Sequence, residues 1–223
     1  MPFKEYLLDR SLLPEPYSTA QKAETYDCVI PQAYGRNTFE NRVLPMIRKR
    51  RDDFGSDIAM FRWLHDQGFD SGEPNRFISE SCYQAVELLG RHVPVIGQWE
   101  VMFALWKAYP QWYESNTNTL VAIWPAECGR QNTYELLLEA MEVCKTRNVS
   151  VPLIPAAPQH TPRTFFLAKK IFGTSPAVVK RYPDEDPNHW YDPKSVQWQT
   201  RSERLWLLYE SLSRIHHHLF GWL

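Results

Sequence analysis

Short apolar runs that alternate with longer helical segments constrain the fold of this chain most strongly. The runs are Cys28–Ile30, His92–Gly97, Leu120–Trp124 and Val149–Pro155, with Ala177–Lys180 as a possible fifth. Each has the length and composition of a strand buried on both faces of a parallel sheet. Strands alternating with helices are typical of βαβ units. We therefore expect an α/β fold, with a Rossmann-like open, mostly parallel sheet and helices on both faces.

Helical periodicity fills most of the chain between these runs. The expected helices are residues 4–13, 38–51, 56–67, 77–89, 99–108, 132–145, 161–172 and 200–217. Residues 68–75 and 183–198 are expected to be loops, and the second loop is interpreted as a lid or flank. At 223 residues the length favours one domain. Its core is expected at about 26–219, with residues 1–25 as a helical extension at the amino terminus.

The composition is that of an ordinary globular protein, with 43% hydrophobic and 23% charged residues. The net charge of −1 predicts no nucleic-acid partner. The basic run at 48–51 is followed at once by Asp52 and Asp53, so it is interpreted as a solvated helix end. No apolar run approaches the roughly 20 residues that would cross a bilayer. We expect a cytoplasmic protein without a membrane span.

The four cysteines form no Cys-x-x-Cys pair and no disulfide framework. We expect Cys28, Cys82, Cys128 and Cys144 to be reduced and mostly buried, as in a cytosolic compartment.

Polar residues follow the expected strands, and ligands on open parallel sheets bind beyond the carboxyl ends of the strands. Residues 32–37 follow the first strand, residues 127–133 the third, and residues 159–163 the fourth. The ends of parallel strands share one edge of the sheet. Glu127, Asn132, His160 and Arg163 are therefore expected to converge, although they are distant in sequence.

The segment Glu127–Glu135 joins a strand to a helix. Asn132 or Thr133 is a candidate amino-terminal cap, with Glu135 placed to complete a capping box. A purely structural cap is one interpretation. Alternatively, the helix amino terminus beside Arg130 attracts an anion, and Glu127 serves as a general base or hydrogen-bond acceptor.

The segment QHTPR at 159–163 suggests proton transfer. Histidine side chains in general titrate near neutral pH, which suits proton transfer, and Arg163 lies one helical turn from His160 with a planar fork suited to phosphate or carboxylate. A structural role at the helix start is the alternative. His216, His217 and His218 point in different directions on a helix and are interpreted as solvated. The sequence has no P-loop, no His-Glu-x-x-His, no Gly-x-Ser-x-Gly and no glycine-rich dinucleotide turn.

The segments Glu127–Glu135 and Ile154–Arg163 together resemble the YdcF-like family, which includes the SanA and ElyC proteins and is known as a domain of unknown function. The matching positions are Glu127, Asn132, Thr133, Glu135, His160, Pro162 and Arg163. Glu203–Arg204 and Tyr209 are similar to the closing helix of the family. The resemblance covers roughly residues 26–219 and is strongest from about 120 to 172. It departs from the family at IPQAYGR after the first strand, at Leu136, and at Ala156–Ala157.

The resemblance implies a Rossmann-like fold and a small anionic or nucleotide-type ligand. We expect an enzyme of unknown specificity, a transferase or hydrolase, that acts on a phosphorylated or nucleotide-like molecule. His160 and Glu127 are the candidate catalytic residues. The candidate ligand-binding residues are Arg163, Asn132, Thr133, Arg130, Arg36 and Asn41.

Two alternatives stay open at this point. One is a non-catalytic module that binds S-adenosylmethionine or another nucleotide. The other is a scaffold whose site has lapsed, since the first loop departs from the family. Glu127 and His160 could supply two metal ligands, which are too few to predict a metal.

Overall fold

The computed structural model describes residues 25–34, 45, 47, 53–90, 92–125, 132–157, 160–173, 177–179, 191, 193, 195 and 197–219. Five strands form one sheet in the order β3-β2-β1-β4-β5, and every neighbouring pair is parallel. The strands are β1 (Cys28–Val29), β2 (Val95–Gln98), β3 (Leu120–Ile123), β4 (Pro152–Pro155) and β5 (Ala177–Val179). The expected α/β class, with an open parallel sheet, is confirmed.

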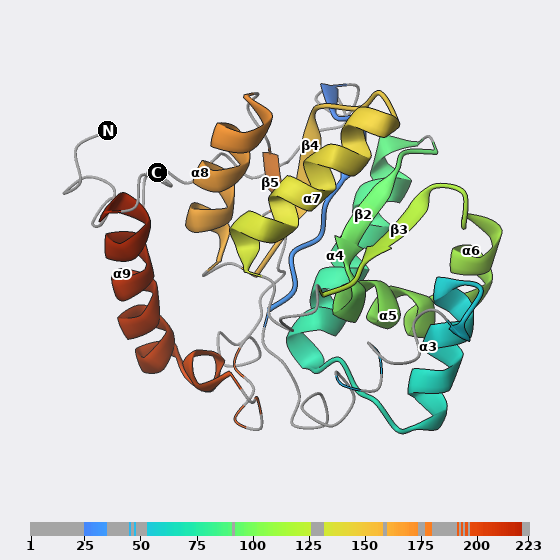
Figure 1. The fold of residues 1–223 in the computed structure, drawn as a ribbon, viewed down its shortest axis with the longest axis horizontal. Coiled ribbons are helices and arrows are strands. Elements are labelled where there is room, and N and C mark those ends of the chain that lie inside the picture. The colour runs from blue at the N-terminus through green and yellow to red at the C-terminus, as the bar shows by residue number, and fades with distance from the viewer. Residues whose placement is uncertain are drawn as a thin grey trace.

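Helices pack on both faces of this sheet (Figure 1). One face carries α3 (Asp57–Asp66), α4 (Glu73–Leu89) and α5 (Trp99–Ala108); the other carries α7 (Thr133–Thr146) and α8 (Thr161–Phe172). The short α6 (Pro110–Ser115) follows α5, and η4 (Trp198–Thr200) precedes the last helix, α9 (Glu203–Leu219).

Successive strand residues serve opposite faces, as the pleat of a strand requires. Val29 packs in the core cluster of α3, α4 and α5, whereas Cys28 and Ile30 pack in the cluster of α7 and α8. The sheet is therefore apolar on both sides, which is why its strands read as continuous hydrophobic runs.

Several expected boundaries were wrong, most clearly at α4. The helix begins at Glu73 rather than Phe77, so part of the expected loop at 68–75 is helical. Gly72 has a φ of 84°, which lets the chain turn sharply, and Pro74 occupies the first turn. The side chain of Asn75 then donates to the Ser71 carbonyl at 2.7 Å and fixes the turn.

Other segments also differ from expectation. The sequence did not indicate α6, and the last helix begins at Glu203 after a short 3-10 turn. Residues 4–13, almost all of 38–51 and most of 183–198 lie outside the described residues.

The described cysteines fit the expectation of buried thiols. Cys28, Cys82 and Cys144 are buried and form no disulfide, while Cys128 lies outside the described residues. Burial raises the pKa of the Cys82 thiol. The sulfurs of Cys28 on β1 and Cys144 on α7 are 3.8 Å apart and hydrogen-bonded.

Close packing at Gly97 of β2 gives a direct test of the fold. A Cβ added at Gly97 would lie 2.7 Å from Cγ of Pro31, whose ring is tied to the backbone. We expect Gly97→Ala to lower the free energy of unfolding by about 1–3 kcal/mol, measured by urea denaturation. Gly55→Ala is the matched control, because nothing lies within 4 Å of a Cβ added there. Equal stability of the two variants would contradict this packing.

Candidate functional site

The sheet has a topological switch point between β1 and β4. From β1 the chain continues to β2 on one side, and from β3 it crosses to β4 on the other side. Loops that leave two adjacent strands in opposite directions open a crevice, which is where open α/β sheets bind ligands. This order, 3-2-1-4-5, is the one that the Rossmann fold uses.

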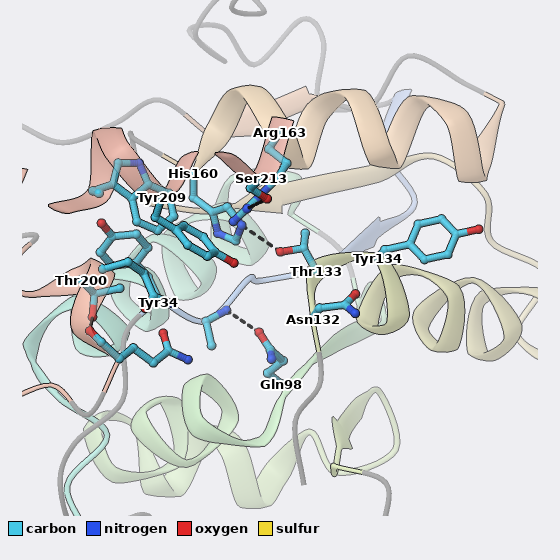
Figure 2. Close-up of a pocket in the computed structure, with 14 residues that line it drawn as sticks. Tyr34, Gln98, Asn132, Thr133, Tyr134, His160, Arg163, Thr200, Tyr209 and Ser213 are labelled. Atoms are coloured by element: carbon cyan, nitrogen blue, oxygen red, sulfur yellow. Dashed lines mark hydrogen bonds between the residues drawn. The ribbon is translucent and has the colours of Figure 1, made fainter. Parts of the chain in front are cut away.

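A pocket of about 110 Å³ lies at this point, and we call it the switch-point pocket. Residues that end or follow four strands line it, and so do residues of η4 and α9 (Figure 2). The described lining residues are Ala33, Tyr34, Gln98, Asn132, Thr133, Tyr134, His160, Arg163, Gln197, Gln199, Thr200, Trp206, Tyr209 and Ser213.

The start of α7 is fixed by a complete capping box, which confirms the predicted cap. The Asn132 side chain accepts from the Glu135 N–H at 2.9 Å, and the Glu135 carboxylate accepts from the Asn132 N–H at 3.0 Å. Thr133, the first helical residue, is thereby held at the pocket with its hydroxyl beside His160.

His160 joins the starts of the two helices α7 and α8. Its Nε2 lies 2.9 Å from Oγ1 of Thr133, and the tautomer decides which atom donates. The ring is buried, with its centroid 5.8 Å from that of Trp206 in an edge-on contact. Residue 160 directly precedes α8, which spans Thr161–Phe172 as predicted. His160 thus links the start of α8 to the hydroxyl of Thr133 at the pocket.

Arg163 is buried against α9 rather than open to solvent. Its Nη1 donates to Oγ of Ser213 at 2.7 Å and lies 3.4 Å from Oε2 of Glu210. Its guanidinium also lies over the rings of Trp206 and Tyr209, at 5.6 Å and 5.5 Å from their centroids. Arg163 was expected to hold an anion, but in the structure its charge already has a counter-ion within the protein, Glu210.

Tyr34 closes the pocket from the end of β1. Its backbone N–H donates to Oδ1 of Asn75 at 2.8 Å, and the neighbouring Ala33 N–H donates to Oε1 of Gln98 at 2.9 Å. The phenol is 2% exposed, and burial raises its pKa well above the usual range, with Tyr191 and Glu210 adding to the rise. At neutral pH Tyr34 is therefore a protonated donor.

Two polar atoms at this pocket lack partners within the described part of the chain. They are the Tyr34 hydroxyl and Nε of Arg163, and both side chains are buried. The side-chain amide of fully buried Gln32 also has no partner there, and its backbone N–H donates to the Pro155 carbonyl across the switch point. Buried polar groups are nearly always hydrogen-bonded, so such a group of exceptions indicates a missing partner.

The structure brings four of the predicted site residues together at this pocket: Asn132, Thr133, His160 and Arg163. Glu127, Arg130, Arg36 and Asn41 lie outside the described residues. The expected convergence of the third and fourth strand exits is thus confirmed for the described members.

Sequence analysis missed the contribution of β2 and of the carboxyl-terminal segment. Gln98 was overlooked because it directly follows an apolar run and precedes a helix. Trp206, Tyr209 and Ser213 lie on one side of α9, and their spacing of three and four residues could have indicated a shared face. Glu210 lies in the same helix and is buried, but no sequence pattern predicts that a glutamate at this position is buried.

Other site types find no support in the described part of the chain. Among those residues, no three His, Cys, Asp or Glu side chains group closely enough to hold a metal ion. None of the described helices combines the length and apolar character needed to cross a membrane.

The chain matches no protein-family model, no curated protein and no solved structure. The resemblance to the YdcF-like family therefore stays a prediction from its motif residues, and the site is interpreted from its own geometry.

The buried ion pair between α8 and α9 is open to a mutational test. Both side chains of Arg163 and Glu210 are 6% exposed. We expect Arg163→Met to lower the free energy of unfolding by about 3–5 kcal/mol, because it leaves Glu210 buried without this partner. The double variant Arg163→Met with Glu210→Leu should recover to within about 1 kcal/mol of wild type. Denaturant titration measures both, and a double variant less stable than the single one would contradict the pairing.

Proposed function

We propose that this chain binds a small polar metabolite in the switch-point pocket, and that His160 exchanges a proton with it. The observation that carries the proposal is the hydrogen-bonded His160–Thr133 pair inside a pocket that also holds the Tyr34 hydroxyl, which has no hydrogen-bond partner among the described residues. Acid–base catalysis needs a base, a neighbouring hydroxyl and a further hydrogen-bond donor in one crevice. His160, Thr133 and Tyr34 would supply these three groups here.

A phosphorylated or nucleotide-like molecule suits this arrangement best. The capping box uses the amides of Asn132 and Glu135, and the amino terminus of α7 carries partial positive charge. An anionic group placed there would lie beside Thr133 and His160. Arg163 in this proposal orients α9 against the pocket and offers only its Nε, since Glu210 offsets its charge.

A non-catalytic binding module is the second candidate function, and the Arg163–Glu210 pair favours it. Phosphoryl chemistry usually places uncompensated cations on the reacting group. The described lining holds one arginine, and that arginine is already paired. Binding of S-adenosylmethionine or another nucleotide without turnover would need no such cation.

Removing one hydroxyl tests the binding proposal. Tyr34→Phe deletes an atom with no partner in the described structure, so the unliganded protein should keep its stability. Thermal denaturation is run with nucleotides, sugar phosphates, S-adenosylmethionine and divalent metals. A compound at 100 times its dissociation constant should stabilise wild type by about 2.7 kcal/mol. We expect Tyr34→Phe to lose about 1 kcal/mol of that gain.

Tyr113→Phe is the matched control. Its hydroxyl is also buried without a partner in the described structure, but it lies in the core under α3 and α5. It should respond to the compound as wild type does. If both variants keep the full stabilisation, the ligand does not contact Tyr34 and the proposed site is wrong.

Turnover of the same compound separates the two candidate functions. Conversion followed by mass spectrometry should fall about a hundredfold or more in His160→Gln, the range that general acid–base residues supply. Binding without any conversion by wild type would leave the non-catalytic module as the function.

A further inference from the structure

The switch-point pocket has two chemically different walls. Figure 2 shows Gln98, Asn132 and Thr133 on one side of the space, and Tyr34, Thr200 and Tyr209 on the other. The His160–Thr133 hydrogen bond lies between them. The first wall comes from the carboxyl end of β2 and the start of α7, and the second mainly from η4 and α9.

The first wall presents oriented amide donors. Backbone N–H groups hold the side-chain oxygens of both amides: Ala33 donates to Gln98, and Glu135 donates to Asn132. This fixes which end of each amide is oxygen, so the NH₂ groups are the ends left to serve a ligand. Neither NH₂ group donates to another described residue. The wall therefore offers the NH₂ groups of Gln98 and Asn132 as donors. It also offers the hydroxyl of Thr133, which can donate and accept.

The second wall presents aromatic rings with polar edges. Trp206 packs on Tyr34 with ring centroids 4.8 Å apart and on Tyr209 at 5.7 Å, so the three rings form one cluster. Tyr34 and Trp206 are buried in this cluster, and Tyr209 is its more exposed ring. Tyr209 is half-buried, and Thr200 lies on the same wall with its hydroxyl hydrogen-bonded to Oγ of Ser195 and to the Gln197 carbonyl. Such rings bind flat, partly apolar groups through their faces.

The charge of the lining residues and the volume of the pocket limit the kind of chemical group that it can bind. The one guanidinium in the described lining lies 3.4 Å from a carboxylate, so the walls offer neutral donors and acceptors rather than net charge. Neutral hydroxyls are served by amide and hydroxyl side chains, which both donate and accept. The volume of about 110 Å³ is well below the roughly 300 Å³ at which drug-sized pockets begin. It suits one ring rather than a dinucleotide.

We infer that the switch-point pocket recognises a single sugar ring, with the aromatic wall against the C–H face of the ring and the amide wall against its hydroxyls. The inference rests on the proposed function, because the sugar is the part of the metabolite that would lie between the two walls. The ribose of a nucleoside and the ring of a hexose share this chemistry. An anionic group attached to either would extend towards the start of α7.

Two pairs of uncharged compounds test the inference on the wild-type chain. One pair is adenosine and its dideoxy analogue that lacks both ribose hydroxyls. The other is methyl glucopyranoside and its dideoxy analogue. Dissociation constants are measured by ligand-observed NMR. We expect the hydroxyl-bearing member of one pair to bind roughly tenfold tighter or more, because the analogue leaves the amide donor of buried Gln98 without an acceptor. If adenosine binds more tightly than its dideoxy analogue, the recognised sugar is a ribose. If methyl glucopyranoside binds more tightly than its dideoxy analogue, the recognised sugar is a hexose.

A single-residue variant links this discrimination to the pocket. Gln199 lines the pocket and is half-buried, so Gln199→Met should reduce the affinity of the discriminated sugar by roughly threefold to tenfold. Gln84→Met is the matched control, because Gln84 is an exposed residue of α4 outside the pocket lining. Equal affinity of the two variants would place the sugar elsewhere and overturn the inference.

The failure of this inference is distinguishable from the failure of the proposed function. If phosphorylated compounds bind and depend on Tyr34, but neither uncharged pair discriminates, the proposed function survives and the sugar inference is wrong. If no compound of any class binds, both are wrong.

Discussion

The strand order β3-β2-β1-β4-β5 is the constraint on which the rest of this molecule depends. Because all five strands are parallel, their carboxyl ends share one edge, and the loops after β1 and β4 diverge there. The divergence opens a crevice that the sheet itself cannot fill. Ala33 and Tyr34 enter it from β1, and His160 enters it from the end of β4. Long-range hydrogen bonds from Ala33 to Gln98 and from Tyr34 to Asn75 then hold the first loop in place.

The crevice is completed by α9, which Arg163 ties to α8. Contacts with Ser213 and Glu210 and with the rings of Trp206 and Tyr209 place one guanidinium at the centre of the α8–α9 junction. A buried ion pair contributes little net stability, because desolvation offsets its attraction. Removing either partner would leave a buried charge without this counter-ion, so the pair favours the observed placement of α9 against α8. The aromatic wall is a consequence of that position.

Much of the scaffold could be predicted from sequence because its signals are local. The apolar runs predicted the strands, and the Asn-Thr-x-Glu segment predicted the cap that fixes Thr133. The start of α4 at Glu73 was missed although Gly72 and Pro74 are local signals of it. The burial of Asn75 and its bond from the Tyr34 N–H, in contrast, depend on tertiary contacts. The pairing of Arg163 with Glu210 was missed for a related reason. Those residues belong to different helices, and the buried state of Glu210 comes only from tertiary packing of α9 against α8.

A crystal structure of the wild-type chain with its tightest-binding compound is the most direct test of the account. The account predicts density for the compound between Thr133 and Tyr209, with a polar atom within hydrogen-bond distance of the Tyr34 hydroxyl and with the Arg163–Glu210 contact intact. A compound bound elsewhere, or a pocket that holds only ordered water at saturating ligand, would contradict the central claim that the switch point is the functional site.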